Sequence, residues 1–267
     1  MRRWTDRSLA VLVGIALFAL LLEAGLRVGG AVFSIDQWRW NRNAAAQAAA
    51  LSVLCVGDSM TAGEYPRMLG AALEERLSQW DVAVFDMGKP STNSWFVLEE
   101  IEAAIDRWHP QLVVAMMGFN DSGEALPYRL EGSDTELSPH EHLRIYKLLR
   151  LARARANGAP SARPPYPETL DAYRQLAEIL HPRGIPLVAM QYPTLSSDGL
   201  RAALGSTDGV LVVDNRDLFI SEADPWQTVY EDHFGGSFGH LNDRGNRQLA
   251  AQLAEAIVSW GPLELGP

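Results

Sequence analysis

The sequence predicts an α/β domain with a doubly wound, mainly parallel five-stranded sheet flanked by helices, preceded by an N-terminal transmembrane or signal-anchor helix. Beyond residue 50, short apolar runs with little polar alternation resemble strands that are covered on both faces. Between these runs, apolar residues recur at helical spacing. Alternation of strands and helices is typical of parallel, doubly wound sheets. A long apolar segment close to the N-terminus indicates the membrane helix.

The N-terminal segment carries Arg2, Arg3 and Arg7 ahead of an apolar run from Leu9 to Leu22. A span needs about 20 apolar residues, and snorkelling of the flanking charged side chains lets a shorter run cross. Arginines ahead of the run predict a cytoplasmic N-terminus and an exported remainder. We expect an uncleaved signal anchor over residues 1–33, which leaves the protein membrane-anchored with its domain extracytoplasmic, periplasmic or at the cell surface. A cleaved signal peptide and a soluble amphipathic helix are the alternatives.

A linker over residues 34–50 is expected to lead into one domain over 51–260. Its expected strands are Leu51 to Val56, Val82 to Met87, Leu112 to Met117, Ile185 to Gln191 and Val210 to Val213. Its expected helices present apolar faces formed by Met68, Leu69, Ala72, Leu73 and Leu77, by Val97, Ile101, Ala104, Ile105 and Trp108, by Leu170, Tyr173, Leu176, Ala177 and Leu180, and by Leu249, Leu253 and Ile257.

Residues 122–167 break the alternation of strands and helices. They contain a basic helical stretch from Leu143 to Arg155 and end in a proline-rich segment. Insertions of this kind form either a lid or wall of a site, or a solvated excursion. Both interpretations stay open from the sequence.

Composition narrows the classes of partner. The net charge of −10 disfavours nucleic acid, because a basic excess is needed to neutralise phosphates. Cys55 is the single cysteine, so an intramolecular disulfide is impossible. Its place in the first apolar run predicts a buried small side chain rather than a reactive thiol.

The residues that follow the strands carry the chemistry, because ligands of doubly wound sheets bind at the carboxyl ends of the strands. Ser59, in Gly-Asp-Ser after the first strand, is the candidate nucleophile. His240, ahead of the last helix, is the candidate base that takes the proton of the Ser59 hydroxyl. The backbone amides of Ser59 and Gly88 and the side-chain amide of Asn120 are candidate oxyanion-hole donors.

This pattern resembles the SGNH superfamily of GDSL-type esterases and lipases. Ser59 in G-D-S-x-x-x-G, Gly88, Asn120 in G-x-N-D and His240 occur in the order of that superfamily, within residues 51–260. The resemblance implies the flavodoxin-like SGNH hydrolase fold, a serine ester hydrolase, and no metal or organic cofactor. The G-x-S-x-G elbow of α/β-hydrolases is absent, because Thr61 stands two residues after Ser59.

The sequence departs from the family pattern at the third triad position. Family members usually place an aspartate three residues before the histidine, where this chain has Ser237. A serine hydroxyl accepts the imidazole N–H but brings no negative charge to stabilise the imidazolium. Three interpretations stay open: a Ser-His dyad oriented by Ser237, a substitute carboxylate such as Asp232 or Asp243, and loss of activity.

Other polar and aromatic residues receive structural interpretations. We expect Asp58 to cap the helix after it and Asp121 to brace a loop. His140 and His142 lack a compact metal-ligand spacing, so solvated loop positions are expected. The aromatic residues in 225–234 either line the site or pack in the core.

The expected function is hydrolysis of an oxygen ester by an exported serine esterase, through an acyl-enzyme. The expected partners are a small-molecule, carbohydrate or lipid ester and, through the N-terminal helix, the membrane. The alternatives are an acyltransferase that acts on a cell-envelope polysaccharide and an inactive binding module.

Overall fold

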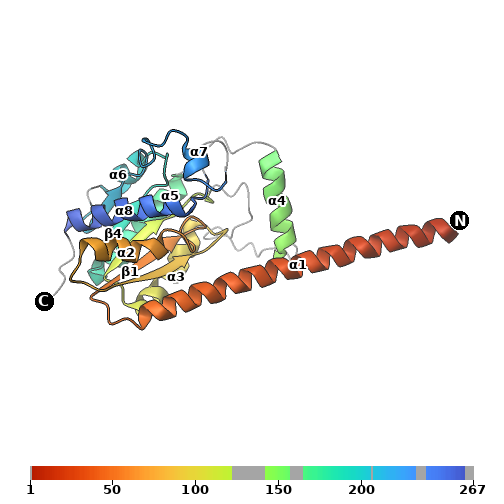
Figure 1. The fold of residues 1–267 in the computed structure, drawn as a ribbon, viewed down its shortest axis with the longest axis horizontal. Coiled ribbons are helices and arrows are strands. Elements are labelled where there is room, and N and C mark those ends of the chain that lie inside the picture. The colour runs from red at the N-terminus through yellow and green to blue at the C-terminus, as the bar shows by residue number, and fades with distance from the viewer. Residues whose placement is uncertain (1, 122–141, 157–164, 206, 233–238, 262–267) are drawn as a thin grey trace.

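The sheet contains five strands, which a computed structural model places in the order β2-β1-β3-β4-β5 (Figure 1). The structure describes residues 2–121, 142–156, 165–205, 207–232 and 239–261. The strands are β1 (Leu51–Gly57), β2 (Val82–Gly88), β3 (Leu112–Met116), β4 (Leu187–Met190) and β5 (Val210–Val213). Every neighbouring pair is parallel. The expected five-stranded, parallel sheet is therefore confirmed.

Strand β4 is shorter than the apolar run that predicted it. The strand begins at Leu187 rather than at Ile185. Pro186 lies between these positions and has no N–H to offer the ladder, although its carbonyl accepts a hydrogen bond from Val113 N–H at 3.0 Å.

Helices cover both faces of the sheet, because alternate residues of a strand point to opposite sides. On one face, α2 (Pro66–Arg76) and α8 (Asp243–Trp260) share a core with the side of β1 that includes Val53 and Cys55. On the other face, α3 (Ser94–Trp108) and α5 (Pro167–Leu180) share a core with Leu54 and Val56. Shorter helices are α6 (Asp198–Leu204), α7 (Pro225–Thr228) and the 3₁₀ helix His181–Arg183.

Cys55 is fully buried in the first of these two cores. Burial raises the pKa of its thiol well above the ordinary value. The thiol therefore stays protonated and shielded from reagents, as expected for a small packing residue.

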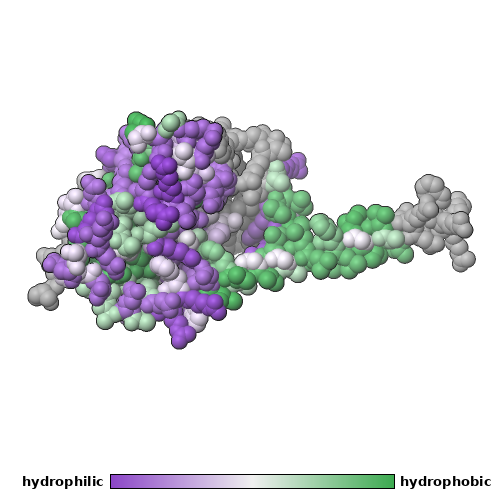
Figure 2. All heavy atoms as spheres, viewed as in Figure 1, coloured by the Kyte–Doolittle hydropathy of each residue, from purple (hydrophilic) through white to green (hydrophobic). Residues whose placement is uncertain are grey.

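Helix α1 (Arg2–Ala45) is a single long helix whose N-terminal half projects from the domain (Figure 1). It is long and apolar enough to cross a membrane, with an 18-residue window of mean hydropathy 2.5 that is 0% buried. Figure 2 shows the projecting part as a largely hydrophobic surface. Residues 34–45, which we expected within a linker, continue this helix without a break.

The last turns of α1 cover the edge of the sheet formed by β2. The Asn41 side chain accepts a hydrogen bond from Asp86 N–H at 2.8 Å and donates one to Asp86 C=O at 2.8 Å. Trp40 Nε1 donates to the Val84 carbonyl at 2.9 Å, and Gln37 Nε2 donates to the Gly88 carbonyl at 2.7 Å. Helical side chains thereby satisfy backbone groups that an exposed edge strand would leave unpaired.

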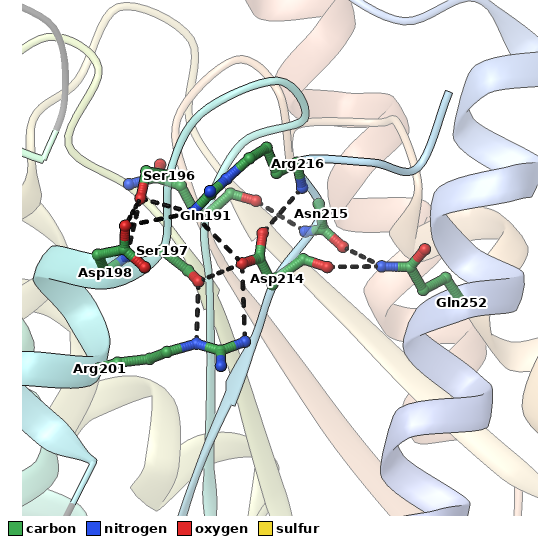
Figure 3. Close-up of polar contacts among 9 residues, drawn as sticks. All are labelled: Gln191, Ser196, Ser197, Asp198, Arg201, Asp214, Asn215, Arg216 and Gln252. Carbon is green, nitrogen blue, oxygen red and sulfur yellow. Dashed lines mark hydrogen bonds and ion pairs between the residues drawn. The ribbon is translucent and has the colours of Figure 1, made fainter. Parts of the chain in front are cut away.

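At the opposite edge of the sheet, formed by β5, a polar network links the segments that follow β4 and β5 (Figure 3). Asn215 Nδ2 donates to the Gln191 carbonyl at 2.7 Å, which ties the segment after β5 to the segment after β4. Gln252 of α8 donates to the Asp214 carbonyl and to Asn215 Oδ1, each at 2.9 Å. Ser197 Oγ donates to Asp214 Oδ2 at 2.7 Å.

Within the region expected as an insertion, the structure describes helix α4 (Arg144–Ala156), close to the expected basic stretch. This helix contacts α1 and stands across it (Figure 1).

Candidate active site

Ser59 lies in the turn that follows β1, at the carboxyl end of the sheet. The strand ends at Gly57, where an added Cβ would lie 2.1 Å from the Met116 carbonyl oxygen of β3 and 2.3 Å from Thr61 Oγ1. Only glycine fits this approach of two backbones. The half-buried Ser59 side chain is thus presented beside the end of β3.

The segment after Ser59 differs from the expected strand-to-helix turn. Thr61 N–H and Ala62 N–H both donate to the Asp58 carbonyl at 3.1 Å, which forms a compact run of turns over residues 58–65. Helix α2 begins only at Pro66, whose ring favours the first helical position. Asp58 is therefore not the cap of α2, contrary to our expectation.

Asp58 instead braces the turn that carries Ser59. Its Oδ1 accepts a hydrogen bond from Met60 N–H at 3.0 Å, and its Oδ2 accepts one from the Tyr192 hydroxyl at 2.5 Å. The carboxyl is fully buried, and desolvation raises its pKa to about 6, while the hydrogen bond from Tyr192 lowers it.

His240 lies between Ser59 and Asp232. The distance from His240 Nε2 to Ser59 Oγ is 2.8 Å, and the distance from His240 Nδ1 to Asp232 Oδ2 is also 2.8 Å. Asp232 Oδ1 accepts a further hydrogen bond from His240 N–H at 2.7 Å. The chain thus brings together a hydroxyl, an imidazole and a carboxylate that are separated by up to 181 positions.

A short antiparallel bridge holds Asp232 and His240 close to each other. Tyr230 pairs with Leu241, and Glu231 N–H donates to the His240 carbonyl at 2.8 Å. Because the bridge joins the residues on either side of this pair, Asp232 and His240 become neighbours although they are eight positions apart.

The other candidates for the third position are placed differently. Ser237 lies outside the described residues. Asp243 begins α8 and is 84% exposed, with its Oδ2 3.7 Å from Arg247 Nη2 of the next helical turn.

Asn120 lies in the loop after β3, beside the segment that follows β2. Its Nδ2 donates to the Thr92 carbonyl at 2.8 Å, which leaves the second hydrogen of the amide available to another acceptor. Asp121 accepts hydrogen bonds from Ser94 N–H at 2.8 Å and Ser94 Oγ at 2.7 Å, and another from Thr169 Oγ1. It therefore braces the loop, as expected.

Gly88 lies at the carboxyl end of β2, paired with Gly57, as the sequence indicated. Its N–H donates to Asp86 Oδ1 at 2.8 Å, so the amide is already engaged. A Cβ at Gly88 would lie 2.2 Å from Ala62 N, which explains the glycine as a packing requirement.

Tyr192 is a residue of the site that sequence reasoning missed. It is buried after β4, where its hydroxyl donates to Asp58 Oδ2 and accepts from Phe119 N–H at 3.0 Å. The hydroxyl thus joins the turn of Ser59 to the loop of Asn120. Its position directly after a strand could have indicated a residue of the site. The sequence does not show, however, that its hydroxyl contacts Asp58.

The aromatic residues of 225–234 that are described pack in the core. Tyr230 is buried, with its ring 4.4 Å from that of Trp226 and 5.6 Å from that of Phe219. His140 and its acidic neighbours lie outside the described residues. Among the residues described, no cluster of three or more histidine, cysteine or acidic side chains is arranged to hold a metal.

Comparisons with known proteins agree on the architecture. The GDSL-like Lipase/Acylhydrolase family matches residues 55–248. The fold is similar to that of LAE5, an α/β hydrolase from the metagenome of Lake Arreo in Spain, at 17% identity and a TM-score of 0.51, covering 79% of this chain and 96% of that one. No curated protein matches the chain significantly.

Two carbohydrate esterases are also similar in fold. Axe2, an acetylxylan esterase from Geobacillus stearothermophilus, is 14% identical with a TM-score of 0.52 over 78% of this chain and 94% of that one. CEX, a two-domain esterase active on acetylated mannans, is 12% identical with a TM-score of 0.53 over 81% of this chain and 51% of that one.

Proposed function

The chain belongs to the GDSL-like lipase/acylhydrolase family, which makes it a hydrolase of ester bonds, and we propose that it works as a membrane-anchored serine esterase through an acyl-enzyme. The observation that carries the proposal is the continuous contact from Ser59 Oγ through His240 to Asp232. A serine hydroxyl is a weak nucleophile until a neighbouring base takes its proton.

In the proposed mechanism, His240 Nε2 accepts the Ser59 proton as Oγ attacks the ester carbonyl, and the carbonyl oxygen becomes an oxyanion. His240 then gives the proton to the departing alcohol, and the acyl group stays on Ser59. Water, deprotonated by the same imidazole, attacks the acyl-enzyme and releases the acid. Each proton that leaves a nucleophile is returned to a leaving group.

Asp232 serves this cycle in two ways. Its Oδ2 holds Nδ1–H of His240, which keeps Nε2 available as the base, and its charge stabilises the imidazolium. The bond from His240 N–H to Oδ1 fixes the carboxylate itself. We propose Asp232 as the third member of the triad.

The proposed oxyanion donors are the Ser59 N–H and Asn120 Nδ2. No hydrogen-bond acceptor for Ser59 N–H is found among the described residues, and Asn120 has a hydrogen to spare. Gly88 is not retained as a donor, because Asp86 already engages its amide.

We propose that α1 is an uncleaved anchor that leaves the domain extracytoplasmic. Cleavage after α1 would remove Gln37, Trp40 and Asn41, which complete the edge of β2. The three arginines at the N-terminus favour a cytoplasmic start.

The test is the reaction of the full-length protein with p-nitrophenyl esters of increasing chain length and with a fluorophosphonate that labels active serines. We expect Ser59-dependent turnover and labelling, both lost in Ser59→Ala. Equal turnover in Ser59→Ala would refute the mechanism. Faster formation of acylated sugar than of free acid, with a sugar acceptor present, would instead identify an acyltransferase. The acetylated glycans named for Axe2 and CEX make acetylated saccharides the first natural substrates to try.

A further inference from the structure

The direction of α1 determines which way the active site faces. Along α1 from Gln37 to Asn41, the partners on β2 run backwards from Gly88 to Asp86. Helix α1 therefore runs antiparallel to β2, and its N-terminal half extends beyond the carboxyl ends of the strands (Figure 1). Because all strands are parallel and Gly57 pairs with Gly88, Ser59 lies at the same end. The candidate active site faces the membrane segment.

A charged junction marks where that segment leaves the hydrocarbon. Glu23 Oε1 pairs with Arg27 Nε at 2.7 Å, and Glu23 Oε2 accepts a hydrogen bond from Ile145 N–H of α4 at 2.9 Å. Arg144 Nη1 donates to the Leu26 carbonyl at 2.9 Å. Charged groups avoid the centre of the hydrocarbon core, so we place its boundary at this junction, over Glu23 to Arg27, where the most apolar part of α1 ends.

Helix α4 suits a position beside lipid headgroups. Its sequence, RIYKLLRLARARA, has five basic residues and no acidic one, in a chain whose net charge is −10. Leu148 is 44% exposed and Leu149 is 63% exposed. A basic helix with exposed leucines, standing across the anchor at its boundary, is typical of an interfacial helix.

The charge of α4 also reaches the loop after β2. Burial lowers the pKa of Lys89 in this loop, the charge of Glu100 opposes the shift, and the charge of Lys147 on α4 adds to it.

The distance between the boundary and the site follows from the helix rise. The 14 residues from Glu23 to Gln37 advance an unbroken helix by about 21 Å. Gln37 is bonded to Gly88 at the level of the strand ends, so with α1 along the membrane normal the site stands about 20 Å from the hydrocarbon. Glycerol esters of phospholipids lie at the boundary, under a headgroup layer of roughly 5–7 Å.

We propose that the enzyme acts on an ester carried by a large hydrophilic headgroup of a membrane-anchored molecule, about 20 Å above the hydrocarbon, and not on phospholipid glycerol esters. The proposal rests on the proposed esterase function and names its substrate class. The docking of α1 on β2 and the junction with α4 hold the serine at this height and facing this layer. A carrier of matching length presents its ester at high effective concentration.

The test uses the full chain in lipid nanodiscs, with an acetylated oligosaccharide linked to a lipid through ethylene-glycol spacers of graded length. Soluble acetylated oligosaccharide and the disc phospholipids are the comparison substrates. We expect the rate to peak at a spacer that reaches about 20 Å, roughly tenfold above an acetate held at the surface.

Two matched insertions between Leu22 and Glu23 test the height of the active site above the hydrocarbon. Seven polar, helix-forming residues lengthen the part of α1 between the hydrocarbon and the domain by about 10 Å. They rotate the helix face by only about 20°. We expect the optimum to move to a spacer about 10 Å longer, with the rate on soluble substrate unchanged. Seven apolar residues at the same place lengthen the span instead, so the optimum should stay.

The outcomes separate this inference from the esterase proposal. Loss of Ser59-dependent turnover on soluble esters would refute the esterase function itself. Retained soluble turnover with rates independent of spacer length, an optimum unmoved by the polar insertion, rapid phospholipid hydrolysis, or failure of the protein to enter the discs would each overturn the substrate class.

Discussion

The two oxygens of Asp232 contact the same histidine at different atoms: Oδ2 lies 2.8 Å from His240 Nδ1, and Oδ1 lies 2.7 Å from the backbone nitrogen of His240. A carboxylate held at both oxygens cannot rotate away from the ring without losing the backbone bond. The imidazole therefore has a fixed partner, although the position three residues before it carries Ser237.

Replacing Asp232 by asparagine should lower kcat by about 10²- to 10⁴-fold, because the amide removes the charge and can favour the wrong tautomer of His240. The measurement is turnover of a p-nitrophenyl ester, with circular dichroism to confirm folding. Asp243→Asn is the matched control and should keep full activity, since Asp243 is exposed and near Arg247. Ser237→Asp should bring no gain. A gain there, with an active Asp232→Asn enzyme, would contradict the assignment.

Asn120→Ala should lower kcat by about 10²- to 10³-fold, or roughly 2.7–4 kcal/mol, with little change in KM, because an oxyanion donor acts mainly in the transition state. Asn93→Ala is the control. Asn93 Oδ1 accepts from Phe96 N–H at 3.1 Å as the N-cap of α3, so its loss should cost about 1 kcal/mol of stability and leave kcat intact. A raised KM with unchanged kcat in Asn120→Ala would assign Asn120 to substrate binding instead.

The sequence predicted the sheet and the main helices because burial on both faces leaves unmixed apolar runs. It also predicted that Ser59, Asn120 and His240 lie in one region. Ser59 and Asn120 follow strands, and His240 precedes the last helix. Asp232 stayed ambiguous, because its contact depends on the bridge between Tyr230 and Leu241, which local pattern does not encode. Gly88 was expected to be an oxyanion donor, but the sequence did not reveal that the side chain of Asp86 accepts a hydrogen bond from its amide.

The sequence also did not predict that α1 docks on β2. Gln37, Trp40 and Asn41 are spaced for one face of a helix, but polar residues on a helix usually indicate a solvated face. Here they replace a neighbouring strand as the partner of the sheet edge. A prediction of local structure cannot anticipate this, because the partner lies about 45 residues away.

Asn41→Ala should lower the free energy of unfolding by about 1–3 kcal/mol, because it leaves the buried N–H and C=O of Asp86 without their partner. Arg39→Ala, at an exposed position of the same helix, should change stability by less than about 0.5 kcal/mol. Chemical denaturation in detergent gives the stabilities, and hydrogen exchange at the Asp86 amide gives the local effect. Equal protection of that amide in both variants would contradict the docking.

The burial of Asp58 predicts a pH dependence of stability. Its pKa rises from 3.8 to about 6 on folding, chiefly by desolvation. The folded state then binds the proton more tightly than the unfolded state, so this group's contribution to stability is complete below pH 4 and is lost as the pH rises through 6. The shift corresponds to about 3 kcal/mol.

Asp58→Asn should remove this dependence. The amide keeps an acceptor for Met60 N–H but cannot accept the Tyr192 hydroxyl hydrogen, which costs about 1 kcal/mol at every pH. Relative to Asp58→Asn, the native protein should therefore lose stability between pH 4 and pH 7, measured by denaturation at both values. Asp198→Asn is the control: hydrogen bonding from Ser196 and the charge of Arg216 lower the Asp198 pKa, so its contribution is lost only below about pH 4 and the two stabilities should differ little between pH 4 and pH 7. A difference between native and Asp58→Asn proteins that stays constant with pH would show that the Asp58 carboxyl is not stabilised in its protonated form.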